Sequence, residues 1–63
     1  MNIITRTIAA QLSVPERVAL LVQRRMIEAG FRFGSATEPE LREAIETAYD
    51  DYIVDSIVAI ACN

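Results

Sequence analysis

The sequence predicts an all-α protein of three helices that pairs with a second copy of itself. Two observations predict the helices. The pattern [ST]-x-Pro-Glu occurs at residues 13–16 and 37–40, and apolar residues recur at helical spacing beside it. A third observation predicts the pairing, because 52% of the 63 residues are hydrophobic, more than so short a chain buries by itself. We expect one domain, residues 1–63, folded as an intertwined helical homodimer.

The first helix is expected over residues 2–12. Ile4, Ile8 and Leu12 recur at the spacing of one helical turn, and Asn2 stands where a capping residue would. The β-branched stretch IITRT at residues 3–7 leaves a strand as the alternative. The sequence alone leaves both alternatives open for this segment.

The middle and third helices are expected over residues 14–29 and 38–61. In each [ST]-x-Pro-Glu pattern the hydroxyl of Ser13 or Thr37 can accept a hydrogen bond from an amide of the first turn. The glutamate three residues later can reach back to the cap residue's own N–H, which makes a capping box. Proline is tolerated there because its missing N–H would have no partner within the helix. These two segments are the clearest helix starts in the chain.

A short loop is expected between these helices, at residues 30–36. Gly30 is a natural left-handed cap for the end of the middle helix. Phe31 and Phe33 lie within the loop, and we expect both rings to fold back onto the core. Beyond the loop, an ordinary amphipathic face is expected on the third helix, formed by Leu41, Ile45, Ala48, Tyr49 and Tyr52.

The last turns of the third helix are apolar on nearly every side. This is unfavourable in water, so we expect them to lie in the dimer interface. Burial and chain entropy nearly cancel in a chain of this length, and small proteins then need a disulfide, a metal or a partner. Cys62 is the single cysteine and the chain has no histidine, which leaves the partner. The predicted interface residues are Ile53, Val54, Ile57, Val58 and Ile60.

The charges divide between the two halves of the chain. Residues 1–36 hold five arginines against two glutamates, whereas residues 37–63 hold one arginine against seven carboxylates. Pairing between the halves, within or between chains, is the simplest expectation. Two surfaces remain candidates for contact with a partner protein or DNA: Arg17, Arg24 and Arg25 on the middle helix, and the acidic face of the third.

The sequence argues against enzymatic activity. Histidine, the commonest general acid or base, is missing, and the two glycines fit no phosphate-binding loop. Asp51 and Asp55 lie one turn apart but lack a third converging ligand, so a solvated face is expected. Cys62 has no basic neighbour to activate it. We therefore expect no catalytic residue, no metal and no cofactor.

Residues 8–31 resemble the helix-turn-helix of bacterial winged-helix regulators. The resemblance rests on Ile8-Ala9-Ala10-Gln11-Leu12-Ser13-Val14-Pro15, on Val18, Val22 and Met26, and on Glu28-Ala29-Gly30-Phe31. It implies a recognition helix at residues 15–25, with Arg17, Arg24 and Arg25 near phosphates or bases. Two features depart from this pattern: Leu20 and Leu21 stand where polar, DNA-facing side chains are usual, and the pI is acidic, at about 4.6.

In size, acidic balance and helical character the chain also resembles small early proteins of lambdoid phages, encoded between the exonuclease and excisionase genes. No apolar run is long enough to span a bilayer and no signal-peptide pattern is present, so we expect a cytoplasmic protein. The leading hypothesis is a regulatory protein-interaction module that acts as a helical dimer on a host or phage protein. The alternative is a helix-turn-helix DNA-binding transcriptional regulator.

Overall fold

The computed structural model describes residues 3–62 as three helices: α1 (Ile3–Leu12), α2 (Glu16–Glu28) and α3 (Glu38–Cys62). A 3-10 turn, η1 (Phe33–Ser35), lies in the loop before α3. No strand occurs between residues 3 and 62, so the strand alternative for the first segment is wrong and the all-α prediction is confirmed. Asn2, the predicted cap of the first helix, lies outside the described residues.

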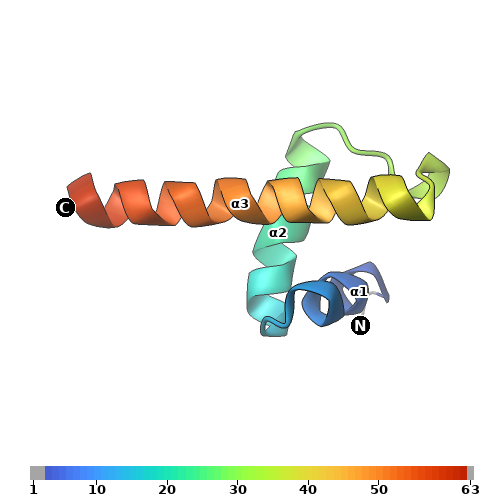
Figure 1. The fold of residues 1–63 in the computed structure, drawn as a ribbon, viewed down its shortest axis with the longest axis horizontal. Coiled ribbons are helices and arrows are strands. Elements are labelled where there is room, and N and C mark those ends of the chain that lie inside the picture. The colour runs from blue at the N-terminus through green and yellow to red at the C-terminus, as the bar shows by residue number, and fades with distance from the viewer. Residues whose placement is uncertain (1–2, 63) are drawn as a thin grey trace.

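Helix α2 is the centre of the fold. It packs against α1 and against α3, whereas α1 and α3 have few contacts with each other. Figure 1 shows α3 crossing α2 and continuing far beyond it. The 25 residues of α3 rise about 38 Å at 1.5 Å each, which accounts for the 39 Å long axis of a molecule only 21 Å and 16 Å across. The C-terminal part of α3 therefore extends away from the other helices described over residues 3–62, and its contact with α2 includes the Arg25–Asp55 ion pair.

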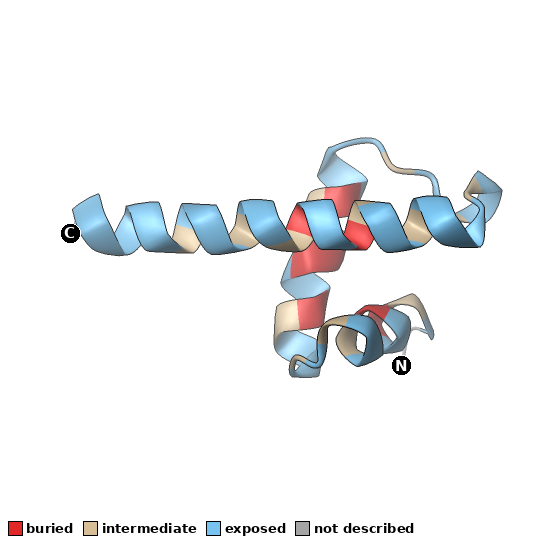
Figure 2. Ribbon diagram, viewed as in Figure 1, coloured by how far each residue is buried: buried red, intermediate tan, exposed pale blue. Residues whose placement is uncertain are grey.

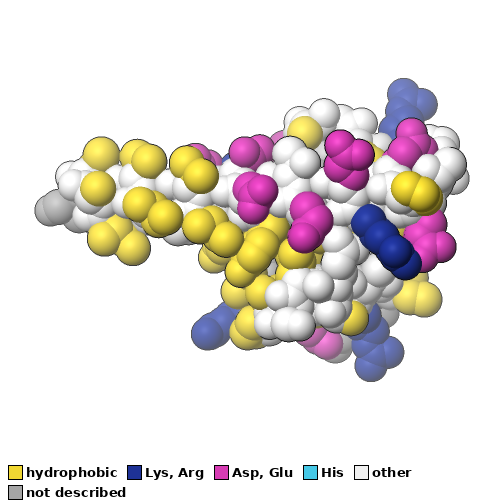
Figure 3. All heavy atoms as spheres, viewed as in Figure 1, with side chains coloured by type: hydrophobic (Ala, Val, Ile, Leu, Met, Phe, Trp, Pro, Cys, Tyr) yellow, Lys and Arg dark blue, Asp and Glu magenta, His cyan; other side chains and the backbone are white. Residues whose placement is uncertain are grey.

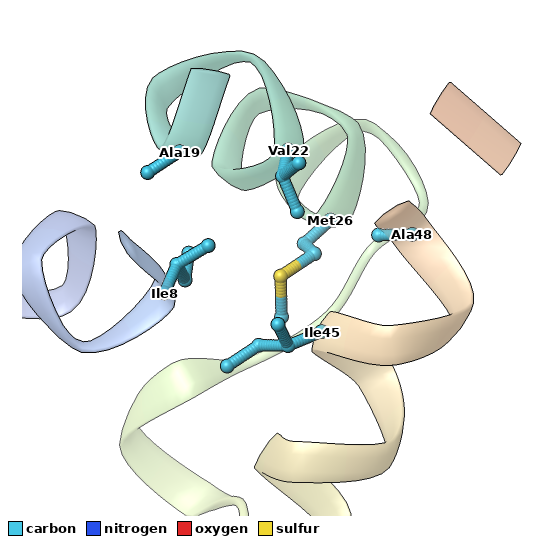
Figure 4. Packing of buried hydrophobic residues seen from close by; sticks show 6 residues of the cluster. All are labelled: Ile8, Ala19, Val22, Met26, Ile45 and Ala48. Atoms are coloured by element: carbon cyan, nitrogen blue, oxygen red, sulfur yellow. The ribbon is translucent and has the colours of Figure 1, made fainter. Parts of the chain in front are cut away.

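A small core lies where the three helices meet. Its side chains point toward one another in Figure 4, with the Met26 thioether between the aliphatic groups of α2 and α3. Figure 2 shows that the buried positions all lie in this region. The fully or nearly buried apolar residues are Ile8, Ala19, Val22, Met26, Ile45 and Ala48.

Residues around this core confirm two predictions. Leu41 and Tyr49 pack against it from α3, as the amphipathic pattern predicted. Phe31 and Phe33 also pack against it, and their rings meet edge to face with centroids 5.0 Å apart. The loop thus closes one end of the core with aromatic surface.

One polar pair is buried between α1 and α2. The Thr5 hydroxyl donates to Gln23 Oε1 at 2.5 Å, and both residues are buried. A buried amide oxygen without a partner would destabilise the fold, so this bond fixes how α1 lies on α2. Sequence periodicity did not predict the pair, because Thr5 and Gln23 are polar residues at inward-facing positions.

The turn between α1 and α2 differs from the predicted capping box. Ser13 has φ 55° and Val14 N–H bonds to the Ala9 carbonyl at 3.1 Å, so Ser13 ends α1 in a left-handed conformation. The N-cap position of α2 is taken by Pro15, and no side chain caps the helix there. The first predicted capping box is therefore wrong. Three residues are too few for Ser13 to close one helix and also cap the next.

The end of α2 agrees with the sequence. Gly30 has φ 85°, Gly30 N–H bonds to the Ile27 carbonyl and Phe31 N–H to the Met26 carbonyl. This is a Schellman motif, in which only glycine adopts the left-handed position without strain. The motif turns the chain so that Phe31 reaches the core.

The start of α3 carries the second capping box, which is confirmed. Thr37 N–H donates to Glu40 Oε1 at 2.8 Å, and Glu40 N–H donates to the Thr37 hydroxyl at 3.4 Å. The Thr37 hydroxyl also donates to Glu40 Oε1 at 2.9 Å. Two backbone amides that a helix leaves unpaired at its start are thereby satisfied.

We predict that Thr37→Ala lowers the free energy of unfolding by about 1 kcal/mol, because the first turn of α3 loses its cap. Urea denaturation followed by circular dichroism measures this change. Ser13→Ala is the matched control. Because the Ser13 side chain caps no helix, a loss as large as that of Thr37→Ala would contradict the assignment.

The same contacts predict a pH dependence at Glu40. Hydrogen bonds from the Thr37 N–H, and then from its hydroxyl, lower the pKa of the Glu40 carboxyl below its ordinary 4.5. A lowered folded-state pKa means that the carboxylate stabilises the fold above the unfolded-state pKa, and that this is lost as pH falls through the folded-state pKa. Unfolding of the native chain and of Glu40→Gln should therefore differ near pH 7 and converge in acid. A difference that persists in acid would contradict the prediction.

Candidate protein-interaction surfaces

The C-terminal part of α3, residues 53–62 and here called the arm, exposes most of its apolar side chains. Figure 3 shows hydrophobic groups covering the arm, which extends away from the body of the molecule. Ile57 is 60% exposed and Ile60 is 75% exposed. All five residues predicted for the dimer interface lie on this exposed arm: Ile53, Val54, Ile57, Val58 and Ile60.

The large apolar side chains of the arm lie together on one part of the helix circumference. Residues four and seven apart share a helix face, which places Ile53, Ile57 and Ile60 along one stripe with Val54 and Val58 beside it. The Tyr52–Ser56–Ala59 line lies about 100° around the helix from this stripe and continues the face that packs on the core closer to the N-terminus. The stripe therefore does not face the chain's own core.

A second apolar area lies on the outer face of α2. Leu20 and Ile27, two turns apart, are both more than half exposed, and Leu21 is exposed as well. Helix α2 is thus apolar on two sides. The side with Val22 and Met26 meets α1 and α3, but within residues 3–62 no element covers Leu20 and Ile27.

The three candidate arginines do not form one cluster. Arg17 and Arg24 are exposed on the outer side of α2, near Leu20. Arg25 instead forms an ion pair with Asp55 of α3, which is the predicted pairing of the basic and acidic halves. As an interaction surface, therefore, only Arg17 and Arg24 share the outer face of α2.

The acidic face of α3 borders a groove of about 690 Å³. One wall is the last turn of α2 with its Schellman motif, including Glu28, Ala29 and Gly30. The other wall is the side of α3 that carries Glu40 and Asp51. The remaining lining residues are Arg25, Met26, Phe31, Glu43, Ala44, Thr47 and Ala48. The sequence showed the acidic face but not the groove, which depends on the angle at which α3 crosses α2.

The carboxylates of Asp51 and Asp55 have different surroundings in the structure. Asp55 is occupied by Arg25, and Asp51 borders the groove. Across residues 3–62, no three Cys, Asp or Glu side chains lie close enough together to hold a metal ion. Cys62 is an exposed thiol at the end of the arm.

None of the helices described over residues 3–62 combines the length and apolar character needed to cross a membrane. Comparison of the chain with known protein families, curated proteins and solved structures gives no match.

Proposed function

We propose that this chain is a non-catalytic regulatory module that acts as a helical homodimer by binding another protein, of a host cell or of a phage. The exposed arm is the observation that carries the proposal. Monomeric proteins rarely leave a contiguous apolar surface of this kind in water, and such surfaces mark interfaces. A second copy of the chain is the simplest partner, because a two-fold axis brings the same apolar surface of both copies together and buries it.

The size of the chain supports the dimer independently. Among residues 3–62, six apolar residues are buried in the core, while nine large hydrophobic side chains are exposed. A domain this small gains little from folding alone, and association adds the missing burial. The dimer would place four candidate surfaces, two grooves and two outer α2 faces, on one assembly.

Sedimentation equilibrium of the chain tests the dimer. The expected mass at micromolar concentration is twice the chain mass of 7.0 kDa, with dissociation on dilution. A mass of one chain up to millimolar concentration would contradict the proposal. Steady growth to large polymers would instead indicate a structural subunit of an open assembly.

A partner protein is the second part of the proposal. The immobilised dimer should retain a partner from a bacterial or phage-infected lysate in a saturable manner. Retention should depend on the groove or on the outer face of α2. If no saturable partner is retained, the regulatory part of the proposal fails even when the dimer is intact.

DNA binding is the alternative, favoured by the exposed Arg17 and Arg24 two turns apart on α2. The same face carries Leu20 and Ile27, and Glu16 and Glu28 begin and end the helix, so it has little excess positive charge. Fluorescence anisotropy with a mixed-sequence duplex decides between the two. Binding that weakens steeply with salt would favour DNA, because arginines then release counterions from phosphates. No binding at low salt would exclude it.

A further inference from the structure

The groove between α2 and α3 has an apolar floor and an acidic rim. Met26 and Phe31 lie at its α2 side, and Ala44 and Ala48 lie along its α3 side. Glu28, Glu43 and Asp51 stand on the rim together with Glu40. The floor offers burial to an apolar ligand, and the rim repels any ligand that is negatively charged.

Helical spacing makes the α3 wall a continuous strip. Glu40, Ala44, Thr47 and Asp51 follow at intervals of four, three and four residues, so they lie on one face. These 11 steps rise about 16 Å, or three turns. Ala44 and Thr47, in the middle of the strip, have small side chains, so that the backbone of a second helix can approach closely. Acidic residues stand at both ends of the strip.

The opposite wall adds further negative potential. The groove meets the C-terminal end of α2, where the helix dipole is negative. Arg25 is the only basic group in the lining, and its guanidinium is held by Asp55, which lies outside it. The carboxylates of Glu28, Glu43 and Asp51 are exposed, so they can turn toward a cation on a ligand, whereas the Glu40 carboxylate is held by Thr37.

The arm of a second copy does not match this groove. Residues 53–62 contain Asp55 and no basic residue, so docking there would bring carboxylates together. Phosphate-rich nucleic acid and anionic membranes are excluded by the same charge. A cation without apolar groups would leave the floor of the groove unused.

We infer that the groove binds a basic amphipathic helix of a partner protein, about three turns long. Its apolar face lies on Ala29, Phe31 and Ala44, the lining residues that keep accessible apolar surface, and its lysine or arginine side chains lie against the rim carboxylates. Helices are commonly recognised by grooves through such a spaced apolar face. The inference rests on the proposed function and names the class of partner.

The test uses two fluorescent 14-residue peptides with leucine at helical spacing, one with lysine at the other positions and one with glutamate. Anisotropy titration of the native protein should show binding of the lysine peptide at micromolar concentration. The glutamate peptide should bind at least about tenfold more weakly, because its charges face the rim. Equal binding of both peptides, or binding of neither, overturns the inference.

Two double variants test the location. Glu43→Gln with Asp51→Asn removes two rim charges, and Glu46→Gln with Asp50→Asn removes two charges from the same helix outside the groove. Both pairs are exposed, both variants change the net charge equally, and the Thr37–Glu40 cap is untouched. The first should weaken binding of the lysine peptide about tenfold and the second less than about twofold. Equal weakening would mean attraction by net charge alone and would overturn the site.

Sedimentation of the same samples separates the two proposals. A native protein that is an intact dimer but does not bind the lysine peptide means that the groove inference fails while the dimer stands. Binding of the lysine peptide by a chain that stays monomeric means that the dimer proposal fails while the groove inference stands. Circular dichroism of each variant shows that its helices are retained.

Discussion

Ile57→Glu should weaken the dimer by at least about 100-fold. Each dimer contains the residue twice, and burying one such side chain is worth roughly 1.5–3 kcal/mol. Every 1.4 kcal/mol changes a dissociation constant about tenfold, and a carboxylate within an apolar interface adds a desolvation cost. Sedimentation velocity over a concentration series measures the change.

Ala59→Glu is the matched control for this prediction. It adds the same side chain and charge to the same helix end, but two residues along a helix points it to nearly the opposite side. We expect less than about a tenfold change in the dissociation constant. Equal effects of the two variants would mean that the Ile53–Ile57–Ile60 stripe is not the interface.

Ile45→Ala should remove a large part of the stability of the fold. Ile45 is 0% exposed and packs between α2 and α3, and such truncations cost about 2–5 kcal/mol. A 63-residue chain has roughly 3–9 kcal/mol of stability at about 0.05–0.15 kcal/mol per residue. Urea denaturation at one fixed protein concentration should show a midpoint far below that of the native chain.

Leu20→Ala removes the same number of carbon atoms from an exposed position on α2. It should cost less than about 1 kcal/mol, because surface positions away from the core tolerate truncation. If Leu20→Ala proved as costly as Ile45→Ala, the outer face of α2 would have to be buried in the dimer, which sedimentation of that variant would reveal.

Local signals in the sequence predicted much of the fold. The Thr37–Glu40 capping box and the Gly30 cap were predicted because each depends on residues within five positions of one another. The inward face of α3 was predicted because Ile45 and Ala48 follow helical spacing. These features need no knowledge of how the helices are arranged.

The remaining errors and omissions have physical causes. The sequence places Ser13 at the start of α2, but in the structure Ser13 ends α1 in a left-handed conformation, and the short turn allows only one of these roles. The Thr5–Gln23 bond and the Arg25–Asp55 ion pair join residues 18 and 30 positions apart. Their formation depends on helix packing, which periodicity does not specify.

Because periodicity does not specify helix packing, the sequence could indicate some functional surfaces and not others. The apolar arm was visible as a run of isoleucine and valine, because a helix end that is apolar on nearly every side can be recognised from the sequence alone. The groove was not visible, since Ala29 and Ala44 acquire a shared role only when α3 crosses the end of α2. The sequence groups the three arginines only by residue type. In the structure Arg25 points to Asp55 of α3, away from Arg17 and Arg24.

Hydrogen–deuterium exchange of residues 53–62 measures whether a second copy of the chain covers the arm. We expect strong protection of these amides when the dimer is formed, and loss of that protection on dilution below the dissociation constant, while the amides around Val22 and Met26 exchange more slowly at each concentration. If the arm exchanges at the rate of a frayed helix end at every concentration, no second copy covers it.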